Sequence, residues 1–135
     1  MQEHEIVSID IDRDWRELYQ RIWHPKAFLE WASGLCGAGL TPREDGSWGG
    51  EGMEGPLRVR FTPHNEFGVL DYWVSQAGEP EIYTSLRVVP NGAGALAMLV
   101  LFRWPGLTET MLAAEAEWAR RDLESLKEWV ERAAD

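Results

Sequence analysis

With 135 residues, the chain is long enough for a hydrophobic core of its own, and we expect residues 1–135 to form a single domain. It carries 23 acidic and 13 basic residues, and the resulting net charge of −10 would repel a phosphate backbone, which argues against nucleic acid as a partner. No apolar run approaches the roughly 20 residues of a membrane span. The first residues also lack the pattern of a signal peptide, so we expect a cytoplasmic protein without a membrane span.

The start of the chain predicts one strand followed by two short helices. Residues 3–11 alternate in polarity, as a half-buried strand does. Asp12 is typical of a helix N-cap, and apolar residues recur behind it at helical spacing. Pro25 suits the first turn of a second helix. The side chains that we expect this second helix to turn inward are Phe28, Leu29 and Trp31.

The middle of the chain predicts an antiparallel meander. Glycine is dense between residues 37 and 56, where we expect one short strand near 42–48 and a mobile loop over 49–55. Four further strand candidates, separated by turn-forming residues, are 57–62, 68–76, 81–89 and 95–104. Residues 107–133 then predict one long helix with an apolar stripe of Leu112, Ala116, Ala119, Leu123, Leu126 and Val130.

Alternation within these strands divides their side chains between two faces. We expect the faces without charge to pack toward the long helix, with Tyr72 opposite Thr84 in the register that aligns them. Asp71 then falls on the outer face, opposite Arg58 and diagonal to Arg87, as one partner of an exposed ion pair.

The same register predicts an apolar row on the outer face of the sheet. A contiguous row of this kind favours a partner surface, most simply that of a homodimer formed through the sheet. The alternative is that each side chain is exposed singly or shielded by arginine stems. The residues of the row are Trp73, Tyr83, Leu99 and Leu101.

The order of these elements resembles the helix-grip fold of the SRPBCC superfamily, which includes START lipid-transfer domains and polyketide cyclase-like proteins. The stretches NEFGVLDYWVSQAG, LRVVPNGAGA, LFRWPGL and RRDLESLKEWVE are similar to its bacterial members. The resemblance implies an α+β fold in which a curved antiparallel sheet wraps around the long C-terminal helix, with two short helices after the first strand. It also implies an apolar cavity between sheet and helix.

In such a fold, Ala116 and Ala119 at the centre of the helical stripe would leave room for a ligand, although small residues also permit close packing. We therefore expect the cavity to bind a small hydrophobic or aromatic molecule. Its predicted lining consists of Trp31, Leu70, Tyr72, Thr84, Leu86, Met98, Phe102, Leu112, Glu115, Ala116 and Ala119.

Catalytic and metal-binding patterns are sparse. The three histidines, His4, His24 and His64, have no metal-binding spacing, so we expect no metal and no cofactor. No serine has an activating histidine beside it in the sequence. The enzymatic alternative is a polyketide cyclase or aromatase-like activity, in which Tyr72 and Glu115 would transfer protons.

Overall fold

The predicted strands form one curved antiparallel sheet in the computed structural model, which describes residues 1–32, 39–52, 55–76 and 78–133. Within these residues the sheet has seven strands in the order β1-β7-β6-β5-β4-β3-β2. The first and last long strands of the chain are therefore neighbours. The bounds are β1 His4–Ile11, β2 Thr41–Pro42, β3 Trp48–Gly52, β4 Gly55–Phe61, β5 Tyr72–Gln76, β6 Ile82–Asn91 and β7 Gly94–Phe102.

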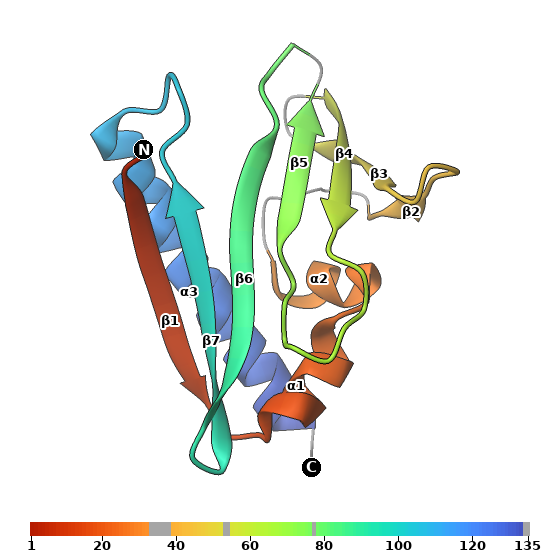
Figure 1. Ribbon diagram of the computed structural model, residues 1–135, viewed down its shortest axis with the longest axis vertical. Helices are drawn as coiled ribbons and strands as arrows, with labels where there is room; N and C mark the ends of the chain where they lie inside the picture. The colour runs from red at the N-terminus through yellow and green to blue at the C-terminus, as the bar shows by residue number, and fades with distance from the viewer. Residues whose placement is uncertain (33–38, 53–54, 77, 134–135) are drawn as a thin grey trace.

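Helices cover one face of this sheet (Figure 1). They are α1 Trp15–Ile22, α2 Pro25–Trp31 and the long α3 Glu109–Ala133. Figure 1 shows α3 behind β1 and β7, and it packs against both strands and against α2. The predicted helical stripe is buried along its whole length, which confirms the helix-grip architecture. Among the described residues, no helix combines the length and the apolar character needed to cross a lipid bilayer.

The helix starts differ from the prediction at one residue. The N-cap of α1 is Asp14, whose carboxylate accepts hydrogen bonds from the backbone N–H groups of Arg16 and Glu17 at 3.1 and 3.3 Å. Asp12 lies before the helix, and its own backbone N–H donates to Glu131. Helix α2 begins at Pro25, as expected.

The face of β7 that we expected to lie outside packs toward the helices instead. Leu99 is 3% exposed and lies opposite Val7, which is also buried. The prediction that Met98 and Phe102 face α3 is therefore wrong, because these side chains alternate with the buried ones. Both faces of β7 are apolar, so the strand itself has no polar side to mark the outer face. The neighbouring strand β1 has a polar side, and its pairing with β7 determines which face of β7 points outward.

The glycine-rich region contains more regular structure than predicted. Residues 48–52, most of which we expected in a mobile loop, form β3 and pair with β4. Trp48 lies opposite Val59 and packs against a second apolar cluster that contains Leu40 and Leu57. Gly52 suits this hairpin, because a Cβ there would lie 2.7 Å from a methyl group of Leu57.

The register between β5 and β6 was predicted correctly, and that between β4 and β5 was not. Tyr72 lies opposite Thr84, as expected, but Arg58 lies opposite Ser75 and not near Asp71. Strand β5 begins at Tyr72, and the segment before it bonds on both sides: the backbone N–H of Thr62 donates to the Asp71 oxygen, and that of Leu70 donates to the Leu86 oxygen. Asp71 is therefore only 5% exposed, which corrects the prediction that it lies on the surface.

Candidate functional site

Four aromatic side chains meet between α2 and the inner face of β4 and β5. The Phe28 ring is their centre, with ring centroids 4.8 Å from Trp31, 4.9 Å from Tyr72 and 5.6 Å from Phe61. Phe28 and Trp31 come from one helix, and Phe61 and Tyr72 lie opposite each other on paired strands. We call these four residues the aromatic layer. Its rings meet edge to face or tilted, which suits their quadrupoles.

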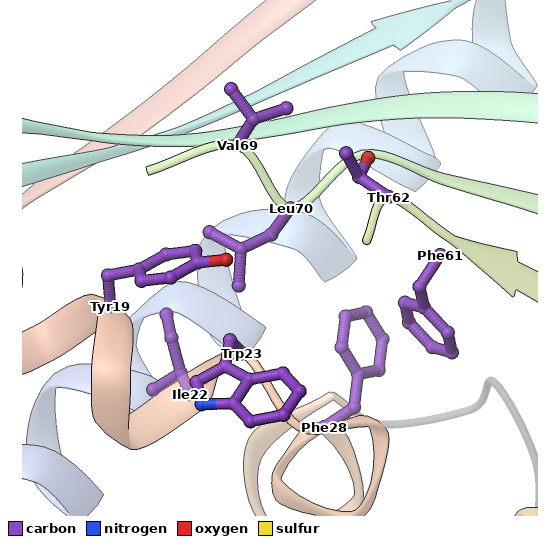
Figure 2. A pocket seen from close by; sticks show the side chains of 8 residues that line it. All are labelled: Tyr19, Ile22, Trp23, Phe28, Phe61, Thr62, Val69 and Leu70. Carbon is purple, nitrogen blue, oxygen red and sulfur yellow. The ribbon is translucent and has the colours of Figure 1, made fainter. Parts of the chain in front are cut away.

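A small cavity borders the aromatic layer (Figure 2). Its volume is about 10 Å³, enough for roughly one water molecule. Figure 2 shows one wall formed by helical side chains and the other by β4 and the segment before β5. The lining residues are Tyr19, Ile22, Trp23, Phe28, Phe61, Thr62, Val69 and Leu70.

The indole N–H of Trp31 is buried in the aromatic layer. Trp31 is only 4% exposed, and its Nε1 atom has no hydrogen-bond partner among the residues that the structure describes. A buried N–H without a partner costs about 1–3 kcal/mol. A bound molecule with an acceptor atom within reach of this N–H would remove that cost.

Tyr72 adds a second polar group to the aromatic layer. Burial raises the pKa of Tyr72, a hydrogen bond with Thr84 lowers it, and the negative charges of Asp122 and Glu115 on α3 raise it further. The net effect is a raised pKa, so the phenol stays protonated at neutral pH. Tyr72 can therefore donate a hydrogen bond to a ligand, whereas it is a poor candidate for a general base.

The side chain of Glu115 is exposed on α3. Partial desolvation raises the pKa of Glu115, and the charge of Asp122 raises it further. Glu115 and Asp122 are seven residues apart, about two turns, so they lie on one flank of α3. The other flank faces β1, where the Lys127 ammonium donates to the backbone oxygen of Asp10.

The structure brings together part of the predicted lining. Tyr72 is partly buried in the aromatic layer and Glu115 is exposed on α3, while Met98 and Phe102 lie on the outer face of the sheet. Their role in ligand binding stays a prediction. The predicted residues that are buried on the inner side are Trp31, Leu70, Thr84, Leu86, Leu112, Ala116 and Ala119.

Several residues of the cavity were absent from the predicted lining. Tyr19, Ile22 and Trp23 come from the first short helix, whose apolar spacing predicted only that one side is buried. Phe28 was expected to face inward, but not to be the centre of a cluster. Leu29, also expected inside, is 38% exposed. A seven-residue helix has too few turns for its apolar residues to define a face.

The outer face of the sheet has a continuous row of side chains across β4, β5, β6, β7 and β1. The Arg60 guanidinium lies 4.5 Å from the Trp73 ring centroid, and the Trp73 and Tyr83 rings are 5.2 Å apart. Tyr83 stacks on Phe102 at 5.9 Å, and Phe102 lies 6.2 Å from His4. We call these five residues the outer row.

Two residues predicted for the outer face lie inside instead. Leu99 is buried in the core, and Leu101 packs against that core, because β7 presents its odd-numbered residues to the helices. Trp73 and Tyr83 are on the outer face, as expected. Phe102 takes the place in the row that Leu101 was predicted to fill.

Other surface features give less support for a functional site. An open groove of about 320 Å³ is lined by Arg43, Pro56, Leu57, Arg58, Ser75 and Gln76. The Arg58 guanidinium there is half exposed and lies 3.5 Å from the Asp45 carboxylate, a geometry typical of a solvated surface. Among the described residues, no group of three or more histidine, cysteine or acidic side chains is placed to hold a metal ion.

No protein-family model matches the sequence, and no curated protein matches it. Solved structures do match. The protein XoxI from Bacillus cereus has a TM-score of 0.73 at 15% identity, covering 93% of each chain. A START superfamily protein from Mycobacterium smegmatis also has a TM-score of 0.73, at 12% identity over 96% of this chain and 98% of its own.

A third similar structure is that of the Aha1 dimer from Colwellia psychrerythraea, with a TM-score of 0.69 and 14% identity over 93% of this chain and 94% of its own. At such low identities, these likenesses show the fold. The chain has the helix-grip fold that the sequence resemblance predicted.

Proposed function

We propose that the protein is a single ligand-binding domain that holds a small hydrophobic or aromatic molecule between the sheet, α2 and α3. The observation that carries this proposal is the buried indole N–H of Trp31 in the aromatic layer, which has no hydrogen-bond partner in the part of the chain that the structure describes. Apolar walls with a few convergent polar groups are typical of small-molecule sites. Here the polar groups are Trp31, Tyr72 and Thr84.

The cavity beside the aromatic layer is far smaller than a ligand. A cavity of about 10 Å³ must grow by more than tenfold to hold one aromatic ring system. Phe28 fills the space between α2 and the sheet, so an outward movement of α2 would open the site where its ring now lies. Binding would then select a minor, open conformation.

Native mass spectrometry of the protein purified from an expression host, with a denatured control, tests this proposal. We expect a co-purifying small molecule that is released on denaturation. Replacing Phe28 with Trp would fill the opening and should abolish that signal. Leu29→Trp is the matched control, because Leu29 is a neighbouring residue on α2 whose side chain is 38% exposed. A wild-type protein without ligand, or equal retention by Phe28→Trp, would remove the site from this location.

The outer row favours a second candidate function, self-association through the sheet. Ile6, opposite Val100 on the outer face, is 56% exposed, and no described element covers Val100, Phe102 or Trp73 on that face. The outward face of an antiparallel sheet is usually polar, so an apolar one favours a partner surface. A second copy of the chain offers the same apolar face, which suits an isologous dimer.

Sedimentation velocity tests this second function. The wild type should sediment as a dimer, and Ile6→Glu and Trp73→Glu should each sediment as monomers, because a charge would be buried at the interface. Met111→Glu is the control, since Met111 is 49% exposed on α3, away from the sheet face. A wild-type monomer at all accessible concentrations would contradict self-association.

A further inference from the structure

We propose that Tyr19 determines the specificity of the cavity beside the aromatic layer, because its hydroxyl donates a hydrogen bond to a carbonyl oxygen of the bound molecule. This inference rests on the proposed function and assigns the small cavity as the place of that oxygen. The chemical class that it names is an aromatic ring with a carbonyl group attached, as in an aryl ketone or amide.

The Tyr19 hydroxyl is buried and uses only part of its hydrogen-bonding capacity within the residues described. Tyr19 is 3% exposed, and its oxygen accepts the backbone N–H of Asn65 at 2.9 Å. A phenol can also donate one hydrogen bond. In the part of the chain that the structure describes, no oxygen or nitrogen accepts the Tyr19 proton. A ligand that brings an acceptor to this buried donor would therefore be stabilised.

Tyr19 also faces the cavity, of which it is a lining residue. Figure 2 shows its ring extending from α1, with the hydroxyl oxygen toward Leu70 on the opposite wall. The Thr62 hydroxyl, also in the lining, already donates to a backbone oxygen at 2.9 Å. The nitrogen of Trp23 lies on the side of its ring away from Phe28 in Figure 2. Tyr19 is therefore the donor that the lining presents to a ligand.

The loop between β4 and β5 holds the Tyr19 side chain in place. The His64 ring stacks on the Tyr19 ring, with centroids 5.5 Å apart and planes at 11°, and it lies 4.3 Å from the Trp23 ring. The Asn65 side chain orders this loop, because it donates to the backbone oxygen of Val69 at 2.9 Å and accepts its N–H at 3.3 Å. The hydroxyl is thus oriented before a ligand arrives, which reduces the entropy lost on binding.

The volume of the cavity fits an oxygen atom and not a ring. About 10 Å³ has room for roughly one group of the size of water. Phe28 belongs both to the cavity lining and to the aromatic layer. A ligand ring that takes the place of the Phe28 ring would therefore direct a substituent into the cavity. A carbonyl oxygen has two lone pairs, so a bond from Tyr19 leaves one for a second donor such as Trp31.

Two probes of the same shape test the inference: 2-acetylnaphthalene, which has a carbonyl oxygen, and 2-isopropylnaphthalene, which has a methyl group in its place. Their dissociation constants would be measured at pH 7 by quenching of tryptophan fluorescence. We expect the wild type to bind the ketone about tenfold more tightly. Tyr19→Phe should reduce this preference to about threefold or less, because the ring that stacks on His64 remains and only the hydroxyl is lost. Comparing two probes on one variant cancels any loss of folded stability.

Tyr83→Phe is the matched control, because it also removes a bonded hydroxyl, which lies 2.7 Å from the Asp71 carboxylate, but on the outer face of the sheet. This variant should keep the full preference for the ketone. The carbonyl stretching band of bound 2-acetylnaphthalene gives a second readout, since a hydrogen bond weakens the C=O bond. That band should lie at lower frequency in the wild type than in Tyr19→Phe.

Two results would overturn the inference while the proposed function stands. One is equal binding of both probes by the wild type, and the other is a preference that Tyr19→Phe leaves unchanged. If neither probe binds, the proposed function itself fails.

Discussion

Asp71 and Arg87 form a two-point ion pair at the start of β5. The Arg87 Nη2 atom lies 2.8 Å from Oδ2 of Asp71, and Nε lies 3.0 Å from Oδ1. The same carboxylate accepts the Tyr83 hydroxyl at 2.7 Å and the backbone N–H of Leu86 at 3.1 Å. All these donors belong to β6. The pair therefore fixes where the segment before β5 joins its neighbour.

Asp71→Asn should lower the free energy of unfolding by about 2–4 kcal/mol at neutral pH, because it leaves several donors without their anionic acceptor. Chemical denaturation at pH 7 measures this change. Glu81→Gln is the control, since Glu81 is half exposed and lies 3.4 Å from Arg60, a pair worth about 0–1 kcal/mol. Equal changes in the free energy of unfolding for the two substitutions would show that the Asp71 pair stabilises the protein no more than an exposed pair does.

The destabilisation caused by Asp71→Asn should also depend on pH. Burial works to raise the pKa of Asp71, but hydrogen bonds from Arg87 and Tyr83 outweigh burial and lower it below the ordinary value of 3.8. A carboxylate whose pKa is lowered on folding stabilises the protein above its ordinary pKa and loses that contribution as the pH falls through the lowered value. The difference between wild type and Asp71→Asn should therefore shrink progressively below about pH 4.

Asp71 also shows how far the sequence determined the sheet. Alternation placed Asp71 opposite Arg58 because a continuous strand over 68–76 was assumed. The register is shifted instead: Arg58 lies opposite Ser75, Asp71 bonds through its backbone oxygen to Thr62 just after β4, and its carboxylate joins a buried network with β6. The partner Arg87 was predicted, but the burial was not, because alternation divides residues between two faces without fixing the register of one strand against the next.

Gly68 has a close backbone contact that a side chain would disrupt. Its φ is +70°, and a Cβ atom would lie 2.2 Å from the backbone oxygen of Val88. The two residues are held together because the backbone N–H of Val88 donates a hydrogen bond to the backbone oxygen of Gly68. Gly92 has a similar φ of +60° with open space around it. Gly68→Ala should therefore destabilise the protein by at least about 2 kcal/mol more than Gly92→Ala, measured by thermal unfolding. Equal melting temperatures would contradict the contact.

The orientation of β7 makes opposite predictions for adjacent residues. Leu99→Ala should cost about 2–5 kcal/mol, because Leu99 is 3% exposed and packed in the core. Met98→Ala should cost less than about 1.5 kcal/mol, because Met98 lies on the partly exposed outer face. Urea denaturation of both variants decides between the two faces. The reverse order would restore the orientation predicted from the sequence.

Phe28 connects stability with ligand binding. Phe28→Ala should destabilise the free protein by about 3–5 kcal/mol, because it empties the centre of the aromatic layer. The enlarged cavity should take up 2-naphthamide, which would raise the melting temperature of the variant more than that of the wild type. No stabilisation of the variant by 2-naphthamide would argue against an apolar site around Phe28.

The candidate site was predictable only in outline. The helical stripe with Ala116 and Ala119 followed from periodicity, and its burial is confirmed. The cavity wall from Tyr19 and Trp23 did not, because a short helix can be packed over any part of the sheet. Which side chains converge depends on how α1 and α2 pack, and that is a long-range property of the fold.

The most direct test of ligand binding is the indole region of a two-dimensional ¹H–¹⁵N spectrum during titration with 2-naphthamide. The eight tryptophans give separate reporters, and the Trp31 signal is identified by its absence in Trp31→Phe. We predict that the Trp31 Nε1–H resonance shifts most, in the direction of a newly formed hydrogen bond, while Trp73 on the outer face stays unchanged. A shift confined to Trp73, or no shift at Trp31, would contradict a binding site at the aromatic layer.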